Sequence, residues 1–332
     1  MDIADLLALS VSSGASDLHL SAGVAPMLRV DGEMQQCGLP VFGPDQVRGL
    51  IHSLMTDAQR SAFETGHEAD FSCALAGLGR FRVNAFEQQR GAGAVLRSIA
   101  QRVPSLESLG PGEVFRQLCR LPHGLILVTG ATGSGKSTTL AAMIDHLNRS
   151  RQQHILTIED PIEFIHQPAR CLINQREVHR DTHSFSAALR SALREDPDVI
   201  MLGEMRDLET IRLALTAAET GHLVLATLHT SSAARTIDRM LDVFPAEEKA
   251  MVRSMLSESL QAVISQTLVK KVGGGRVAAH EIMLATPAIR NLIRENKVAQ
   301  MVSAIQTGGA VGMQTLEMSL GRLSEARVIE TL

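Results

Sequence analysis

The segment 130–139, which reads GATGSGKSTT, restricts the fold of this chain more than any other part of the sequence. It contains the complete pattern G-x-x-x-x-G-K-[ST], and the apolar segment 125–129 directly before it is typical of a buried strand. After the pattern, apolar residues recur at helical spacing, at Leu140, Met143, Ile144 and Leu147. A strand, a glycine-rich loop and a helix in this order form a phosphate-binding loop, so we expect a site for a nucleoside triphosphate.

Each part of this loop has an expected role. The glycines allow backbone N–H groups to approach the phosphates, and the N-terminus of the following helix adds a partial positive charge. Lys136 is expected to reach the β- and γ-phosphates, and the hydroxyl of Ser137 is expected to bind Mg²⁺. ATP and Mg²⁺ are therefore the predicted cofactors. The predicted nucleotide-binding residues of the loop are Gly130, Ala131, Thr132, Gly133, Ser134, Gly135, Lys136, Ser137 and Thr138.

The composition narrows the possible partners. The chain of 332 residues carries a formal net charge of −4 and contains no Trp, no Tyr and 9 Phe. Because few aromatic side chains are present on which bases could stack, and the balance of charge is acidic, nucleic acid is not an expected partner. The 4 cysteines are far apart and form no C-x-x-C pair, which indicates a reducing compartment rather than a zinc site or a disulfide framework.

The sequence shows no segment that would place the chain in a membrane. No apolar run approaches the roughly 18–20 residues that a membrane-spanning helix needs. The N-terminus also lacks the pattern of a signal peptide. We therefore expect a cytoplasmic protein that is peripheral to a membrane through a partner.

The chain length suits two domains. Residues 1–100 predict a small α+β domain, with a helix at 2–14, strands at 16–20 and 26–34 that turn at Asp31-Gly32, a helical pattern at 44–64 and a hairpin at 80–99. The segment 101–112 concentrates proline and glycine and is the predicted linker. Residues 113–332 then predict an α/β domain with a C-terminal helical region. Its expected strands, at 125–129, 154–158, 199–202 and 223–228, alternate with helices, which indicates a parallel sheet covered on both faces.

Polar residues lie next to three of these strands. In open α/β sheets, ligands bind beyond the carboxyl ends of the strands, so these residues are candidates for the chemistry. They are Glu159, Asp160 and Glu163 after the strand at 154–158, Glu204 after the strand at 199–202, His229 after the strand at 223–228, and His222 just before that strand.

A carboxylate near the γ-phosphate can polarise the attacking water. Gly203 stands directly after the strand at 199–202, where an Asp that binds Mg²⁺ is usual, so Glu204 is the leading candidate for this role. Glu163 is the rival, and Glu159 and Asp160 are expected to support the metal or the water.

The histidines and one further acid have alternative roles. His229 can sense the γ-phosphate through a hydrogen bond, whereas His222 can either bind the nucleotide or be a packed residue of the core. Asp207 is expected to cap the N-terminus of the helix that follows it.

Four segments together resemble the signature motifs of the ATPases of type II secretion and type IV pilus systems. They are GATGSGKST, TIEDPIEF, LREDPDVIMLGEMRD and TGHLVLATLHT, which are similar to the Walker A motif, the Asp box, the Walker B motif and the His box of that family. A further segment, AIRNLIRE at 288–295, resembles the pilus retraction ATPases of twitching motility, the PilT type. The resemblance covers almost the whole chain.

The resemblance implies a PAS-like N-terminal domain, a RecA-like P-loop ATPase core from residue 113 and a homohexameric ring. It implies that ATP hydrolysis drives domain rotation and pilus retraction, and that the ring meets a platform protein at the cytoplasmic face of the inner membrane. Arginines of the N-terminal domain would reach the phosphates and neutralise their charge. The candidates are Arg82 and Arg97, with Arg80 and Arg90 behind them, while Arg194 and Arg206 are expected to hold the acids of the core.

Other functions stay open at this point. Within the family, the alternatives are an accessory retraction ATPase and an extension or secretion ATPase, although the longer N-terminal region and zinc-binding cysteines of the extension ATPases are not seen here. Outside the family, one alternative is a P-loop kinase of a small molecule, although no arginine-rich lid segment follows the loop. A second is a nucleic-acid translocase of RecA type, which the few aromatic residues and the acidic net charge disfavour. A third is a regulator that binds a nucleotide without turnover, which the acids Glu163 and Glu204 disfavour.

The segment 286–297 has a helical pattern, with Thr286 as N-cap and Pro287 in the first turn. Arg290 and Arg294 lie four residues apart, away from the apolar stripe, and are expected to face solvent. The helix either packs against the core or, as the resemblance implies, transmits hydrolysis into retraction.

Overall fold

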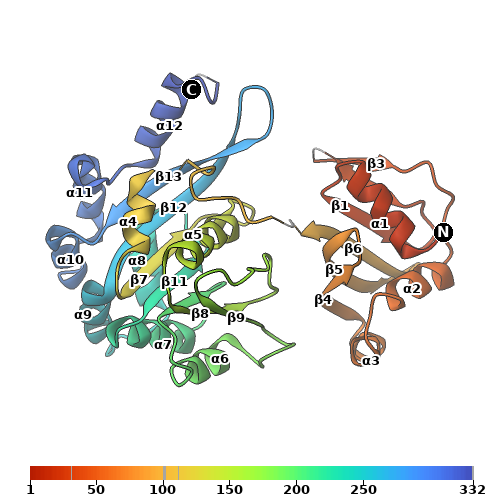
Figure 1. Cartoon of the computed structure of the whole chain (residues 1–332), viewed down its shortest axis with the longest axis horizontal. Coiled ribbons are helices and arrows are strands. Elements are labelled where there is room, and N and C mark those ends of the chain that lie inside the picture. Colours follow the sequence, from red (N-terminus) through yellow and green to blue (C-terminus); the bar gives the residue numbers. More distant parts are fainter. Residues whose placement is uncertain (31, 100–101, 111, 331–332) are drawn as a thin grey trace. The chain divides into compact units, whose positions relative to one another are not determined.

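The computed structural model describes residues 1–30, 32–99, 102–110 and 112–330 (Figure 1). Contacts divide the chain into two compact units, Met1–Arg102 and Val103–Leu332. The exact limits of the domains and the linker stay predictions; they are 1–100 and 113–332 for the domains and 101–112 for the linker. Residues 31, 100, 101, 111, 331 and 332, which include Asp31 of the predicted turn and parts of the predicted linker and C-terminal end, lie outside the described residues.

The N-terminal unit is an antiparallel sheet covered by helices, as predicted for an α+β unit. Its sheet has the order β3-β2-β1-β6-β5-β4. The predicted hairpin at 80–99 is confirmed, because β5 and β6 pair antiparallel with Arg82 opposite Arg97. The elements are α1 (Ile3–Ser12), β1 (Asp17–Ser21), β2 (Met27–Val30), β3 (Glu33–Gln36), α2 (Pro44–His52), α3 (Asp57–Gly66), β4 (Glu68–Leu75), β5 (Gly79–Gln88) and β6 (Gly91–Ile99).

The helical pattern at 44–64 forms two helices rather than one continuous helix. Thr56 caps the N-terminus of α3, since its side chain accepts a hydrogen bond from the backbone N–H of Gln59 and the side chain of Gln59 accepts one from the N–H of Thr56. This reciprocal capping box starts a new helix and satisfies backbone donors that a continuous helix would bond internally.

The C-terminal unit is an α/β layer structure around one sheet of order β13-β12-β7-β11-β10-β8-β9. All neighbouring pairs are parallel except β12 and β13. The four strands predicted from the sequence are confirmed as β7, β8, β10 and β11, whereas β9, β12 and β13 were not predicted. The strands are β7 (Gly124–Thr129), β8 (His154–Glu159), β9 (Leu172–Glu177), β10 (Val199–Leu202), β11 (Leu223–Leu228), β12 (Leu260–Lys270) and β13 (Arg276–Leu284).

Helices cover both faces of this sheet (Figure 1). One core cluster joins α4 and α5 to alternate residues of the central strands, such as Ile126 and Val128. The other cluster joins α6 to α11 to the intervening residues, such as Leu125 and Leu127. The helices are α4 (Glu113–Cys119), α5 (Lys136–Ser150), α6 (Phe185–Ala192), α7 (Leu208–Glu219), α8 (Ala233–Asp242), α9 (Lys249–Ser259), α10 (Pro287–Arg294), α11 (Met301–Thr307) and α12 (Leu316–Glu325).

The helix that carries AIRNLIRE is α10, and Thr286 caps it as predicted. The expectation that Arg290 faces solvent is wrong. Its guanidinium donates to the carbonyl oxygens of Ser257 and Glu258 at 2.6 and 2.7 Å and to the side chain of Gln261 at 3.2 Å. Because the last carbonyls of a helix have no partner inside it, a cation there stabilises the end of α9 and joins it to α10.

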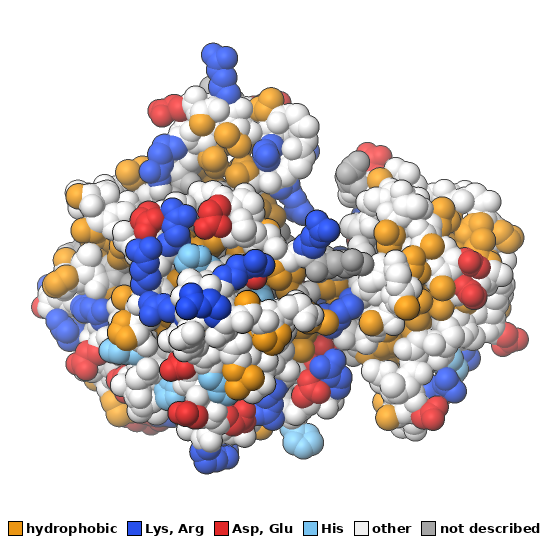
Figure 2. Space-filling view, in the orientation of Figure 1, with side chains coloured by type: hydrophobic (Ala, Val, Ile, Leu, Met, Phe, Trp, Pro, Cys, Tyr) orange, Lys and Arg blue, Asp and Glu red, His pale blue; other side chains and the backbone are white. Residues whose placement is uncertain are grey.

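Positive side chains gather over α4 and α5 on one face of the C-terminal unit (Figure 2). Acids of the same unit lie beside several of them. Arg116 and Arg120 contact Glu113, and Arg149 contacts Asp145. Much of the positive charge on this face is therefore balanced locally. No helix among the described residues is long and apolar enough to cross a membrane.

Candidate active site

The phosphate-binding loop connects β7 to α5, and its glycines are required by its shape. Gly130, Gly133 and Gly135 have φ angles of 145°, 77° and 87°, which side chains other than glycine rarely adopt. A Cβ atom added at Gly130 would lie 2.3 Å from the carbonyl oxygen of Gln266, so the backbone of β12 leaves no room for one. The loop is thus a tight turn pressed against the neighbouring strand, with Ala131, Thr132 and Gly133 exposed at its crown.

Lys136, at the first turn of α5, is buried and bound to the loop. Its Nζ donates to the carbonyl oxygens of Gly130 and Ala131, both at 2.9 Å. Burial lowers the pKa of Lys136, and the nearby carboxylates of Glu204 and Glu163 oppose this shift. The structure therefore brings the two acids predicted for catalysis close to the lysine of the loop.

Glu204 follows β10 and is held from two sides. Its Oε2 lies 3.1 Å from Nε2 of His229, and its Oε1 contacts the guanidinium of Arg206. Its side chain is 17% exposed, whereas that of Arg206 is 76% exposed. Arg206 thus holds an acid of the core, as expected, whereas Arg194 donates to the carbonyl oxygen of Arg190 at 3.0 Å.

Close packing against β8 explains why a glycine, Gly203, occupies the position where an Asp was expected. A Cβ atom at this position would lie 3.3 Å from Cα of Glu159, which is tighter than most contacts of that kind. The carbonyl oxygen of Gly203 also accepts a hydrogen bond of 2.5 Å from Oγ1 of Thr227. The chain therefore passes close to β8 here, and the acid is displaced by one position to Glu204.

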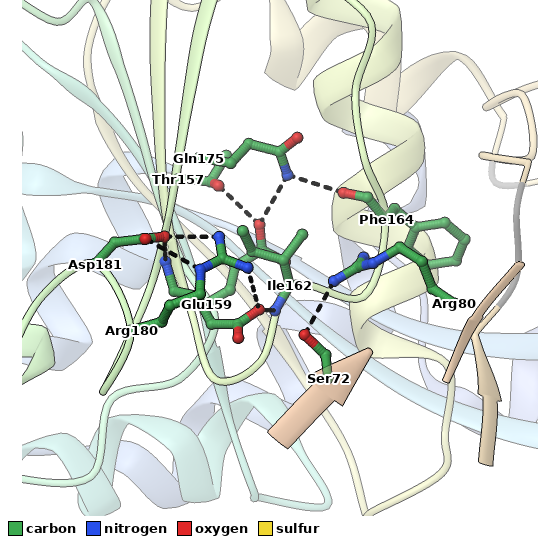
Figure 3. Close-up of polar contacts among 10 residues, drawn as sticks. Ser72, Arg80, Thr157, Glu159, Ile162, Phe164, Gln175, Arg180 and Asp181 are labelled. Carbon is green, nitrogen blue, oxygen red and sulfur yellow. Dashed lines mark hydrogen bonds and ion pairs between the residues drawn. The ribbon is translucent and has the colours of Figure 1, made fainter. Parts of the chain in front are cut away.

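Glu163 and Glu159 come from the same segment but differ in environment. Glu163 is exposed, as is Asp160. Glu159 is only 7% exposed, and its Oε1 accepts hydrogen bonds from Oγ1 of Thr157 at 2.7 Å and from Nε2 of Gln175 at 3.2 Å (Figure 3). Burial raises the pKa of Glu159 to about 7, although these hydrogen bonds oppose the shift. Glu159 thus takes part in an internal network of hydrogen bonds, and its expected support of the metal or the water stays a prediction.

His222 lies apart from the loop. It precedes β11, whereas His229 follows it, and a strand of 6 residues spans about 20 Å. Nδ1 of His222 lies 3.0 Å from the carbonyl oxygen of Ala217, so this ring has a partner at the opposite edge of the sheet. Within one chain, the structure does not bring His222 together with Lys136.

Arg82 and Arg97 lie side by side on one face of the N-terminal sheet, each with a carboxylate. Nε and Nη2 of Arg82 donate to the two oxygens of Asp70 at 3.1 and 2.6 Å, and Nε of Arg97 donates to Asp17 at 2.7 Å. Burial would raise the pKa of Asp17, but hydrogen bonds from Ser16 and Arg97 and the charge of Arg97 hold it below its usual value.

These four side chains line a hollow of about 360 Å³. Of the two candidates of second rank, Arg80 lies two residues before Arg82 on β5, and Arg90 lies in the turn between β5 and β6. Arg80 donates to Oγ of Ser72, and Arg90 donates to the carbonyl oxygen of Ala22.

Gln266 on β12 is a residue of this site that the sequence did not reveal. Its Nε2 donates to the carbonyl oxygen of Ser134 at 2.6 Å, and its Oε1 accepts from Oγ1 of Thr139 at 2.7 Å. The side chain is 3% exposed. It therefore ties the phosphate-binding loop and the start of α5 to a strand more than a hundred residues later in the chain.

The loop fits the phosphates of ATP in its shape and its polar atoms. Within the described part of the chain, the buried hydroxyls of Thr129 and Ser134 have no hydrogen-bond partner. The described residues also contain no group of three or more His, Cys, Asp or Glu side chains that could hold a metal ion. Beside a bound nucleotide, the hydroxyl of Ser137 at the start of α5 would hold a Mg²⁺ together with phosphate oxygens, as this ion usually binds.

Comparisons with known proteins agree with this geometry. A family model described as type II/IV secretion system protein matches residues 3–274. A type IV pilus retraction ATPase, PilT, from Pseudomonas aeruginosa is 70% identical over 320 residues, which are 96% of this chain and 93% of the relative. A twitching motility protein of Neisseria gonorrhoeae is 60% identical over 299 residues, 90% of this chain and 80% of the relative.

A solved structure is similar over the whole length. The crystal structure of the pilus retraction motor PilT with bound ADP is 48% identical and has a TM-score of 0.92, and the match covers 100% of this chain and 95% of the other. The α/β fold with a RecA-like core and an N-terminal domain is thereby confirmed. The chain therefore belongs to the type II/IV secretion system protein family and, within it, to the type IV pilus retraction ATPases.

Proposed function

We propose that this chain hydrolyses Mg²⁺-ATP and that a ring of its copies uses the free energy to retract a type IV pilus in twitching motility. The observation that carries the proposal is the phosphate-binding loop with its buried Lys136, whose charge the carboxylates of Glu204 and Glu163 stabilise. The relatives described above support pilus retraction as the use of this free energy, since they are named for pilus retraction and twitching motility.

In this mechanism, Lys136 binds the β- and γ-phosphates and exchanges its bonds to the loop carbonyls for them. One carboxylate polarises the attacking water. Glu204 is the leading candidate because His229 and Arg206 fix its orientation, and Glu163 is the second. His229 then links the γ-phosphate to Glu204. Mg²⁺ on Ser137 would neutralise charge on the phosphate oxygens.

The arginine pair of the N-terminal unit completes the proposal. Arg82 and Arg97 reach the phosphates in the assembled ring, and to do so they leave the carboxylates of Asp70 and Asp17. A well-placed arginine adds on the order of 10³–10⁵ in rate. We further propose a hexamer as the ring, a platform protein of the inner membrane as the partner, and the cytoplasmic face of that membrane as the location.

The first test is ATP turnover per chain over a dilution series, with the mass of the assembly measured by light scattering on the same samples. Turnover that falls as the ring dissociates supports a site completed by a neighbouring copy. Full turnover by a single chain would contradict the motor and favour the phosphorylation of a small molecule.

The cellular test uses cells in which this chain is the sole retraction ATPase. Labelled pili should shorten with the parent chain and stay extended with Lys136→Ala as the inactive control. Pili that retract equally with the parent chain and with Lys136→Ala would contradict the proposed role. A failure of the cells with Lys136→Ala to assemble pili would instead indicate an extension ATPase.

A further inference from the structure

The segment that carries Glu163 has an irregular backbone and depends on side chains to fix it. Residues 161–168 belong to no helix or strand. Within the segment, Ile162, Phe164 and His166 are buried, and Glu163 and Ile165 between them are exposed. The segment therefore runs extended along the body of the unit, with Glu163 on its outer side.

Side chains of the edge strand β9 hold the backbone of this segment. Oε1 of Gln175 accepts a hydrogen bond from the backbone N–H of His166 at 2.8 Å, and its Nε2 donates to the carbonyl oxygen of Phe164 at 2.8 Å. Two residues further along β9, Oε2 of Glu177 accepts from the backbone N–H of Ile162 at 3.1 Å. Ile162 and Phe164, which these two side chains hold, are the residues directly before and after Glu163 in the sequence, and both are drawn in Figure 3.

Glu159 adds a contact to Glu163 itself. The backbone N–H of Glu163 lies near enough to the carboxylate of Glu159 to lower the pKa of that acid, and Nε2 of Gln175 donates a hydrogen bond to the same carboxylate at 3.2 Å. The carboxamide of Gln175 thus makes three bonds, one as acceptor and two as donor. This combination of roles is available to an amide but not to an ionised carboxylate or an apolar side chain.

We propose that Gln175 is a positioning residue for ATP hydrolysis, which fixes the segment 162–166 so that Glu163 faces the phosphate-binding loop. The inference rests on the proposed function, because it requires that Glu163 takes part in turnover. Gln175 does not touch the reacting atoms. It acts through the backbone on both sides of Glu163 and through Glu159.

The main variant is Gln175→Glu, which has nearly the same shape. It keeps the acceptor for the N–H of His166 but removes both donors and places a second carboxylate against Glu159. The matched control is Asn174→Asp, the same change of amide to acid at the neighbouring, exposed position, where Nδ2 lies 3.0 Å from Nε2 of His154. A second variant, Gln175→Met, removes all three bonds without adding charge.

The full-length ring is assayed for ATP turnover, with the assembly mass and melting curve of each variant as checks of folding. We expect kcat to fall roughly 10- to 100-fold for both variants at Gln175, because a small misplacement of a catalytic group has effects of this size. KM should change less than about 3-fold, since the phosphate-binding loop is not altered. Asn174→Asp should leave both constants unchanged.

The pH profile distinguishes positioning from a general loss of structure. In Gln175→Glu the two adjacent carboxyls share a proton as the pH falls, and a protonated carboxyl regains a donor. Its kcat relative to the parent should therefore recover partly at lower pH, whereas that of Gln175→Met should not. A constant deficit of Gln175→Glu at every pH, or unchanged kcat in both variants, would overturn the proposal.

The link to Glu163 is tested by combination with Glu163→Gln. If Gln175 acts through Glu163, the double variant Gln175→Met with Glu163→Gln turns over no more slowly than Glu163→Gln alone. If the losses of kcat in the two single variants multiply in the double variant, the proposal is overturned. Normal turnover of Glu163→Gln would also overturn the proposed role of Gln175. It would not contradict the proposed motor function, which the mass of the ring and the turnover of Glu204→Gln test separately.

Discussion

The buried carboxyl of Glu159 should make the stability of the C-terminal unit depend on pH. Its folded-state pKa is about 7 against a reference value of 4.5. Because the folded pKa is raised, the folded state binds the proton more tightly than the unfolded chain. Stability is therefore greatest below the unfolded pKa and is lost as the pH rises through the folded pKa. Above both values, the shift corresponds to a penalty of about 3 kcal/mol.

The perturbation is Glu159→Gln, which resembles the protonated acid and cannot ionise. The variant should be more stable than the parent by about 1 kcal/mol near pH 5.5 and by about 3 kcal/mol near pH 8.5. The assay is urea unfolding of the full chain at both pH values, followed by circular dichroism. Glu325→Gln, at an exposed position of α12, is the matched control and should show no such trend.

An advantage of Glu159→Gln that stays constant between the two pH values would refute the reasoning, because a change of packing alone does not depend on pH. A variant that is less stable than the parent at high pH would refute it more strongly. In that case the bonds from Thr157 and Gln175 would stabilise the ionised carboxylate by more than burial destabilises it.

Further predictions concern the phosphate-binding loop and its neighbours. Glu204→Gln should retain nucleotide binding, measured by calorimetry, and lose on the order of 10²–10⁴ in kcat. Lys136→Ala should lose both nucleotide binding and ATP turnover. Normal turnover of Glu204→Gln would transfer the leading role to Glu163. Gly203→Ala should cost about 1–3 kcal/mol of stability, because its Cβ meets the backbone of β8; unchanged unfolding would contradict that contact. Gln266→Leu should cost about 2–5 kcal/mol by leaving Thr139 and a loop carbonyl unpaired, and adding a Thr139→Val change should recover part of this cost.

The parts of the fold that were predicted are those whose signal is local. The segment 125–129 is apolar and precedes a glycine pattern, and 199–202 and 223–228 are short apolar runs with turn residues around them. The strand β12 has no such boundary, since α9 ends at Ser259 and β12 starts at Leu260. It is a strand because its backbone pairs with β7, more than a hundred residues earlier, and a local pattern does not contain that information.

The same distinction separates the site residues that were found from those that were missed. Lys136 and Glu204 belong to short motifs whose spacing carries their chemistry. Gln266 and Gln175 act by reaching across strands to backbone groups, and a glutamine on a strand has no pattern that marks it for such a contact. Glu159 had a usable signal, since the alternation of a strand places it on the same face as Thr157.

Environment rather than residue type divides the work among the three glutamates of the site. Glu159 is enclosed, burial raises its pKa, and its carboxylate accepts hydrogen bonds from Thr157 and Gln175 of the same unit, so these bonds stabilise the fold. Glu204 is mostly buried but contacts His229 and Arg206, which orient it without enclosing it. Glu163 is exposed, and the backbone of its neighbours Ile162 and Phe164 is held by Glu177 and Gln175. An acid that must meet a water beside the γ-phosphate needs access and a fixed direction, and only Glu204 and Glu163 combine them.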